Sequence, residues 1–268
     1  MRASSFLCLA IMLGLAPCLR GEEAEKAISD NSFLIEEAYN QERRVVQHIF
    51  TFQLDFQSRD WVAGFTQEWP AWGPKHQLSY TLLLDRAAGS QPRLAAGPYF
   101  LNYRYQLVYN DRVAVSPRLS LIIPGRRVDG LTSGMGWQAN LPASISLGRL
   151  FVCHLNLGGT WFPAAGNGAG KVSLLQVNYG ASLICLLSGN FNLMLEAAGA
   201  RSERLLPASE SPGGKEWQSD LFLNPGARLA FNFKSGMQIV CGLAVPLELV
   251  GSECNPGAFL YLSIEHPY

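Results

Sequence analysis

The sequence predicts an all-β protein, an antiparallel transmembrane β-barrel of about 12 strands with short periplasmic turns and longer extracellular loops. Three observations lead to this prediction. From Val45 to the C-terminus, apolar and polar residues alternate with the period of two that is typical of β-strands. The connections between these stretches alternate between short and long. The composition, with 48% hydrophobic and only 16% charged residues, suits strands with one apolar face.

The N-terminal residues predict export from the cytoplasm. Arg2 precedes an apolar run, Phe6–Pro17, and the polar residues that follow begin near Arg20. A run of about a dozen apolar residues is too short to span a bilayer as a helix, and it fits the core of a secretory signal peptide. We therefore assign residues 1–21 to a signal peptide, residues 22–44 to a periplasmic N-terminal segment and residues 45–268 to an outer-membrane β-barrel.

The segment at residues 22–44 is polar and acidic, and the sequence leaves its structure open. The stretch from Ile35 to Glu42 is compatible with a short helix. A periplasmic arm and a stretch tucked into the mouth of the barrel fit the composition equally well.

The predicted strands share one pattern of alternation. In the first, Val46, His48 and Phe50 lie on one face, and Gln47 and Thr51 lie on the other. The polar faces carry mainly Asn, Gln, Ser and Thr, whereas a soluble barrel usually spreads Lys and Glu over its exterior. This composition favours apolar faces toward lipid and polar faces toward the lumen. The predicted strands are residues 45–56, 61–69, 77–85, 99–109, 113–123, 137–147, 151–161, 175–187, 191–196, 221–233, 237–248 and 258–268.

The connections support the same architecture independently. In outer-membrane barrels the periplasmic turns are short and the extracellular loops are longer. Only the first connection, at residues 57–60, is short where a long loop is due. Short turns are expected at residues 72–75, 110–112, 148–150, 188–190 and 234–236, and longer loops at residues 86–93, 124–134, 162–171, 201–216 and 249–257.

The C-terminal strand is expected to close the barrel. Its outward residues are Leu260, Leu262, Ile264 and the terminal aromatic Tyr268. This stretch resembles the terminal signal that the barrel-assembly machinery reads, so we expect that machinery and outer-membrane lipid as partners. The alternative is the last strand of a secreted β-sandwich, which alternates in the same way but has no reason to keep the order of short and long connections.

The sequence predicts no enzyme and no cofactor. Outer-membrane phospholipases use a His-x-Ser pair, and none of His48, His76, His154 and His266 has serine two positions on. His154 is therefore expected to be a hydrogen-bonded residue of the lumen wall. The pattern of a nucleophile elbow and the spacing of a calcium loop are both missing from the sequence. With a net charge of zero and a pI near 6.9, the composition gives no reason to expect nucleic-acid binding.

The cysteines also show no metal-binding pattern. Cys153, Cys185, Cys241 and Cys254 lie in the predicted barrel region, and their spacing matches neither a zinc site nor a small disulfide framework. We expect them to pack or to face lipid, and the sequence leaves their disulfide state open.

Charged residues on the predicted lumen face are the candidate site. Two interpretations stay open: internal ion pairs that fill a narrow barrel, or a pore constriction whose charges select solutes. The candidate constriction residues are Asp55, Asp85, Arg104, Arg118, Glu196, Arg228 and Glu248.

Two stretches resemble a known family. They are Phe33–Glu42 (FLIEEAYNQE) running into Val45–Phe52, and Phe65–Pro70 (FTQEWP) followed by His76–Tyr80. Together they resemble the bacterial outer-membrane β-barrel family labelled phenol-degradation meta-pathway transporters. The resemblance implies a channel that passes small hydrophobic or aromatic molecules, and it carries over no solute-binding residues. The hypothesis is thus an outer-membrane channel for a small-molecule solute, and the alternative is a plugged structural or adhesive barrel without transport.

Overall fold

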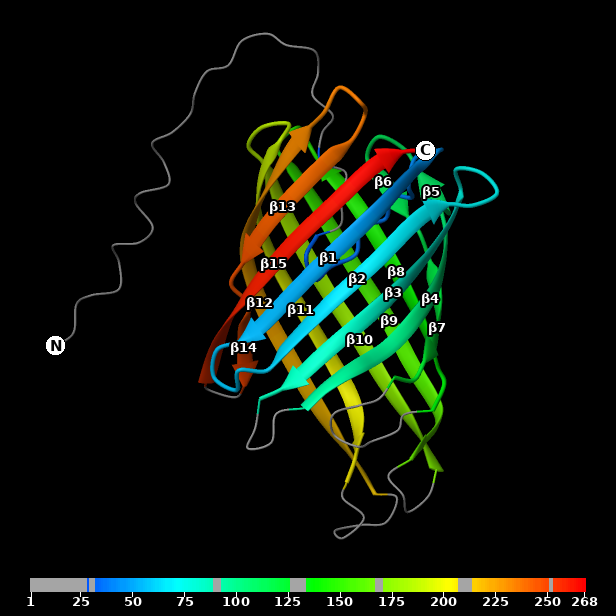
Figure 1. Ribbon diagram of the computed structural model, residues 1–268, viewed down its shortest axis with the longest axis vertical. Helices are drawn as coiled ribbons and strands as arrows, with labels where there is room; N and C mark the ends of the chain where they lie inside the picture. The colour runs from blue at the N-terminus through cyan, green and yellow to red at the C-terminus, as the bar shows by residue number, and fades with distance from the viewer. Residues whose placement is uncertain are drawn as a thin grey trace, which may run out of the picture.

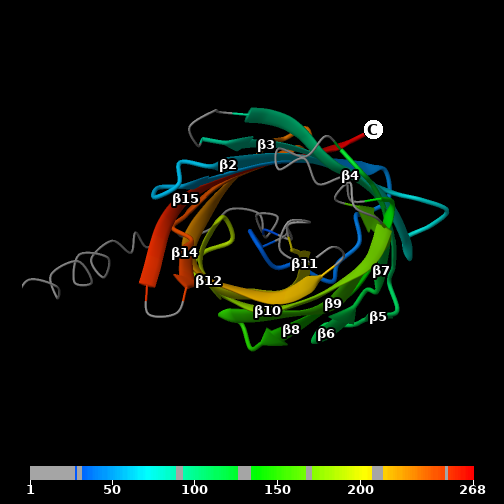
Figure 2. The same ribbon diagram turned by 90° about the horizontal axis from the view of Figure 1, so that it is seen from below.

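A single antiparallel sheet closes on itself to form the barrel (Figures 1 and 2). The computed structural model describes residues 28, 32–88, 93–125, 134–166, 171–206, 214–250 and 253–268, so the expected signal peptide lies outside the described residues. Neighbouring strands follow the order β5-β6-β8-β7-β4-β3-β2-β1-β15-β13-β12-β11-β10-β9, and pairing of β8 with β9 closes the ring. None of the described residues forms a helix long and apolar enough to cross a membrane.

The strands are bounded as follows. They are β1 (Val45–Asp55), β2 (Trp61–Pro70), β3 (His76–Ala87), β4 (Arg93–Tyr105), β5 (Val108–Tyr109), β6 (Val113–Val115), β7 (Arg118–Ile123), β8 (Gly136–Leu147), β9 (Phe151–Gly166), β10 (Lys171–Leu186), β11 (Phe191–Leu205), β12 (Lys215–Asn232), β13 (Gln238–Ala244), β14 (Leu247–Val250) and β15 (Glu253–Pro267).

The fifteen strand segments form twelve barrel strands, because three of the barrel strands are interrupted. β4 continues as β5 after Gln106 and Leu107, β6 as β7 after Ser116 and Pro117, and β13 as β14 after Val245 and Pro246. Proline has no N–H to give to a ladder, which accounts for two of the breaks. The prediction of a closed antiparallel barrel of twelve strands is confirmed.

The exposure of side chains follows the alternation around the barrel. On β9, Leu155 and Leu157 are 41% and 61% exposed, whereas His154, which precedes Leu155 on the same strand and points inward, is 1% exposed. Leu, Phe, Trp and Tyr side chains cover the outside, and Gln47, Gln77 and similar polar residues are buried inside. A soluble protein has the reverse arrangement, so this barrel has the surface that a bilayer requires.

The two rims of the barrel differ. The short-turn rim carries the start of β1, the end of β15 and the turns at residues 71–75, 110–112, 148–150, 187–190 and 233–237 (Figure 1). The opposite rim, called the loop rim, carries the remaining connections. β9 to β12 are 15 to 18 residues long, and about 9–11 residues suffice to cross a bilayer. Strand pairing therefore extends into the loops expected at residues 162–171 and 201–216, which are shorter than the sequence predicted.

The first strand pairs with the last strand along the whole length of β1. β15 pairs β1 from Val45↔Pro267 to Asp55↔Gly257, and it pairs β13 on its other side. Leu260 on β15 is exposed on the outer surface. Beyond the strand, the Tyr268 N–H donates to the Arg44 carbonyl at 2.9 Å. The C-terminal strand therefore joins the two ends of the barrel chain.

Two neighbouring positions on β3 test the assignment of faces. Leu82 is 40% exposed on the outside, while Thr81 faces inward and lies 2.9 Å from the Thr66 hydroxyl. In bilayers with brominated lipid, the tryptophan added by Leu82→Trp should be quenched and that added by Thr81→Trp should be spared. Quenching is measured as the difference from the parent protein, which contains six tryptophans. Equal quenching at both positions would show that the faces are wrongly assigned.

Candidate functional site

Residues 32–44, called here the lumen segment, run from inside the barrel to the exposed residues just before the start of β1 at the short-turn rim. Figure 2 shows this stretch in blue within the ring of strands. Phe33, Ile35, Glu37, Ala38 and Gln41 are all buried. The segment contains no helix or strand, so its backbone groups need partners from the barrel wall. Of the three structures left open for residues 22–44, the described part adopts the one tucked into the barrel.

Polar side chains of the wall supply those partners. Glu196 on β11 is fully buried, and its Oε1 accepts the N–H groups of Leu34 and Ile35 at 3.0 and 3.2 Å. Its Oε2 accepts from the Asn224 amide at 2.7 Å. Further bonds to the segment backbone run from Glu36 N to Asn156 Oδ1 (2.9 Å), Ala38 N to Ser144 Oγ (2.8 Å), Asn40 N to Gln106 Oε1 (3.0 Å), Gln41 N to Gln77 Oε1 (2.7 Å), Gln106 Nε2 to Ala38 O (2.9 Å), Ser116 Oγ to Ala38 O (2.7 Å) and Asn156 Nδ2 to Glu36 O (2.6 Å).

Glu36 is the charged centre of the segment. Its carboxylate forms ion pairs with Arg104 and with Arg118, whose Nε lies 2.9 Å from Glu36 Oε2. The Asn140 amide donates to the same Oε2 at 2.8 Å. Burial alone would raise the pKa of the Glu36 carboxyl, but Arg118 and Arg104 outweigh it and lower the pKa to about 2. Arg104 also donates to the Tyr39 carbonyl at 2.9 Å. The same side chain therefore binds both the Glu36 carboxylate and the backbone of the segment.

An apolar anchor holds the start of the segment. The Phe33 ring packs against Phe259 and Tyr261 of β15, with ring centroids 5.4 and 5.3 Å apart. Two wall glycines make room for it: a Cβ atom at Gly226 would lie 2.7 Å from the Phe33 ring, and one at Gly242 would lie closer still. Ile28 joins the same buried cluster. The segment is thus fixed by packing on the β12–β15 side and by hydrogen bonds elsewhere.

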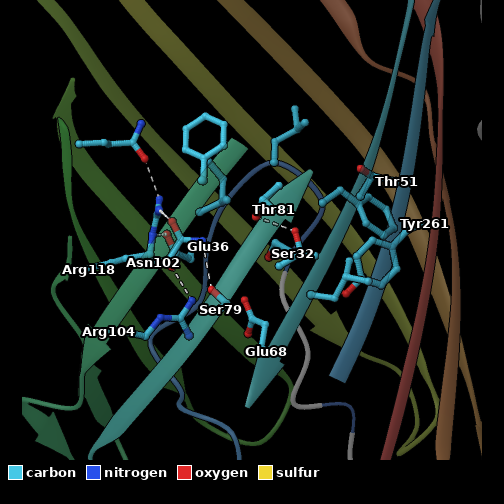
Figure 3. A pocket seen from close by; sticks show the side chains of 17 residues that line it. Ser32, Glu36, Thr51, Glu68, Ser79, Thr81, Asn102, Arg104, Arg118 and Tyr261 are labelled. Carbon is cyan, nitrogen blue, oxygen red and sulfur yellow. Dashed lines mark hydrogen bonds and ion pairs between the residues drawn. The ribbon is translucent and has the colours of Figure 1, made fainter. Parts of the chain in front are cut away.

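A cavity of about 340 Å³ remains between the segment and the opposite wall (Figure 3). One side is formed by residues 32–36 of the segment, and the other by β1, β2, β3, β4, β7, β8 and Tyr261 of β15. Its wall residues are Ile49, Thr51, Thr66, Glu68, Ser79, Thr81, Phe100, Asn102, Arg104, Arg118 and Gln138. Hydroxyl and amide groups therefore alternate with a few apolar side chains around a space large enough for a small molecule.

The candidate constriction residues do not form a ring. Arg104, Arg118 and Glu196 all bind the lumen segment. Arg228 is 2% exposed, and its Nε–H donates to the Asn192 side-chain oxygen at 3.3 Å. The other three lie nearer the loop rim. Asp55 accepts the N–H groups of residues 57 and 58 at 2.8 and 2.6 Å, Asp85 lies near the end of β3, and Glu248 pairs with Phe222 and Asn255 across β14.

Ser144 and His154 form a contact that sequence spacing did not reveal. They are direct partners on β8 and β9, and Ser144 Oγ lies 2.7 Å from His154 Nδ1. Ser144 Oγ also accepts the N–H of Ala38, and both side chains are buried beneath the segment. Because Ser144 Oγ contacts both His154 and the Ala38 N–H and is covered from solvent, its role is to bind the segment. The His154 side chain is a hydrogen-bonded wall residue, as the sequence predicted.

The part of the chain that the structure describes offers no set of three or more His, Cys, Asp or Glu residues that could hold a metal ion. Its four cysteines, Cys153, Cys185, Cys241 and Cys254, are free.

Solved structures share this fold, although no family model and no curated protein matches the sequence. An outer membrane channel from Pseudomonas putida F1 superposes with a TM-score of 0.57 at 12% identity, covering 87% of this chain and 98% of that one. The NanC porin superposes with a TM-score of 0.54 at 6% identity, covering 82% of this chain and all of the other. At these identities the likeness establishes the fold alone, which is that of bacterial outer-membrane barrels. The phenol-transporter label stays a prediction.

Removing the charge of Glu36 should loosen the lumen segment. Glu36→Gln leaves Arg104 and Arg118 without their carboxylate, and breaking a buried ion pair costs roughly 3–5 kcal/mol. Hydrogen exchange of the N–H groups at residues 34–41 should speed up by at least about a hundredfold, because each 1.4 kcal/mol is a factor of ten. The control is Glu42→Gln, which removes the same charge at the exposed end of the segment. Equal exchange in the two variants would contradict the central role of Glu36.

Acid should have a related effect. The pKa of Glu36 falls from 4.5 to about 2 when the segment is docked. A lowered pKa stabilises the docked state fully above about pH 4.5, and this contribution is lost as the pH falls toward 2. Protection factors of the segment amides, corrected for intrinsic exchange, should therefore hold from pH 7 to 5 and decline below pH 4.5. In Glu36→Gln this acid-dependent decline should be smaller, and an unchanged decline would assign it to other groups.

Proposed function

We propose that the protein is an outer-membrane channel for small uncharged molecules, and that the lumen segment is its constriction. The observation that carries this proposal is the 340 Å³ cavity beside the segment, inside a closed barrel with a polar lumen. Ligand pockets occupy about 300–1,000 Å³, so the space suits a solute at the small end of that range. In the outer membrane, the short-turn rim would face the periplasm and the loop rim would face outside.

The charges around the cavity support a preference for uncharged solutes. Four charged side chains line it, two acids and two arginines, and they balance in number. Both arginines, Arg104 and Arg118, already pair with Glu36, and the other acid, Glu68, accepts from the Gln77 amide at 2.7 Å. A wall with paired charges of both signs attracts neither anions nor cations strongly.

The remaining lining adds a second preference. Thr51, Thr66 and Thr81 bring hydroxyl groups from three adjacent strands, while Phe33 and Phe100 add apolar surface. Such a wall accommodates molecules that have both a hydroxyl group and an apolar part. This is consistent with the small hydrophobic or aromatic solutes that the family resemblance implies.

A plugged structural barrel is the second candidate. The bonds that tie the lumen segment to the wall favour it, since they come from strands around most of the barrel. In both candidates the C-terminal strand would be read by the barrel-assembly machinery, which stays a prediction from the sequence.

A disulfide lock distinguishes the candidates. Ser32 Oγ of the segment lies 3.0 Å from Ser182 Oγ on β10, so Ser32→Cys combined with Ser182→Cys places two thiols in contact. The four barrel cysteines are first replaced by alanine, and each single variant is a control. Liposomes with the oxidised protein should swell in glycerol as fast as those with the reduced protein, and more slowly in charged solutes of equal size.

The other outcomes are informative in different ways. Loss of swelling on oxidation, with recovery on reduction, would show that the segment must leave before a solute can pass. The absence of swelling in the parent protein and in every variant would overturn the channel and favour the plugged barrel.

A further inference from the structure

Two histidines meet across the joint between the first and last strands. His48 on β1 and His266 on β15 are diagonal neighbours in the register, in which Val46 pairs His266 and His48 pairs Ile264. Their Nε2 atoms are 3.3 Å apart, and their rings stack with centroids 5.4 Å apart. Both side chains are half-buried on the outer face, close to the start of β1 and the end of β15 at the short-turn rim. Two imidazoles from opposite ends of the barrel chain thus face each other at close range.

The second ring nitrogen of His266 fixes its tautomer. His266 Nδ1 lies 3.1 Å from the Pro267 carbonyl oxygen. A carbonyl oxygen can only accept, so in the neutral ring Nδ1 carries the hydrogen and the Nε2 lone pair points toward His48. Metal-ligating histidines are typically oriented by such a bond from the other ring nitrogen to a backbone carbonyl. His266 therefore has the arrangement of a metal ligand before any metal is bound.

The separation of the two nitrogens selects a geometry. Two Zn–N bonds of about 2.0–2.1 Å at a tetrahedral angle place the nitrogens about 3.3 Å apart. At the right angle of a square-planar copper or nickel site, bonds of the same length would place them about 2.9 Å apart. The observed 3.3 Å matches the tetrahedral case. Partial exposure of both rings leaves access for water at the remaining two positions.

We propose that His48 and His266 bind a Zn²⁺ ion that clasps the first and last strands of the barrel. The two ligands are 218 positions apart in the sequence, so an ion between them cross-links nearly the whole barrel chain. Because the pair exists only once β1 and β15 have met, the ion binds the closed barrel and stabilises it against opening at this joint. The site is independent of the lumen and of any transported solute.

Zinc titration of the full mature protein, refolded in zwitterionic detergent micelles, tests the proposal. Calorimetry should give one Zn²⁺ per chain, and His48→Gln and His266→Gln should each weaken binding by at least tenfold. His76→Gln is the matched control, because His76 begins β3 at the same rim and its Nδ1 contacts the Tyr103 hydroxyl at 2.7 Å instead. Zinc-edge X-ray absorption should show two imidazole ligands at about 2.0 Å.

Stability supplies an independent readout. The temperature at which the barrel loses its fast migration on gels should rise with added Zn²⁺ in the parent and in His76→Gln, and it should stay unchanged in the other two variants. Binding that survives both His48→Gln and His266→Gln would place the ion elsewhere. No binding by the parent at millimolar Zn²⁺ would show that the pair is only a histidine–histidine hydrogen bond, and either result overturns the proposal.

Discussion

Closure of one hydrogen-bonded sheet is the constraint on which every other feature of this chain depends. Lipid offers no partners to backbone N–H and C=O groups, so each strand must pair on both sides. The pairing of β8 with β9 and of β1 with β15 completes the ring. A closed sheet also gives the chain two surfaces, and the period of two sends alternate side chains to each. The apolar exterior and the polar lumen both follow from closure.

A polar lumen in a narrow barrel creates a second requirement. Its side chains, such as Glu196 and Gln77, are largely cut off from water and need partners. The lumen segment meets this need with its own backbone, which has no helix or sheet to satisfy it. The wall and the lumen segment therefore satisfy each other's polar groups. The apolar anchor lies on the β12–β15 side, and the hydrogen bonds come from β3, β4 and β7 to β11. A cavity remains where residues 32–36 face β1 to β4.

The sequence predicted those features of the fold that depend on the local pattern of apolar and polar residues. The alternation of apolar and polar residues located the barrel strands from Val45 onward. Because Arg104 and Arg118 share the polar faces of their strands, the same pattern placed them inside the barrel. It did not predict the partner of these arginines, because Glu36 lies 68 and 82 residues away and in a segment without periodicity. The Ser144–His154 and His48–His266 contacts escaped for the same reason, since they depend on the register between strands. Spacing along one strand carries no information about register, although two polar residues on lumen faces of adjacent strands were a usable signal for the first pair.

The chain reversal at the short-turn rim decides whether the segment plugs the lumen or projects away from it. Arg44, the last residue before β1, has a φ of 59°, in the left-handed region that costs a residue with a side chain roughly 1 kcal/mol or more. Two bonds hold this turn: the Val45 N–H donates to the Glu42 carbonyl at 3.2 Å, and the Tyr268 N–H donates to the Arg44 carbonyl at 2.9 Å. Gln41 then bonds the Gln47 side chain inside the barrel. The last residue of the chain thus helps to direct the lumen segment inward, so that closure of the barrel and filling of its lumen are fixed at the same joint.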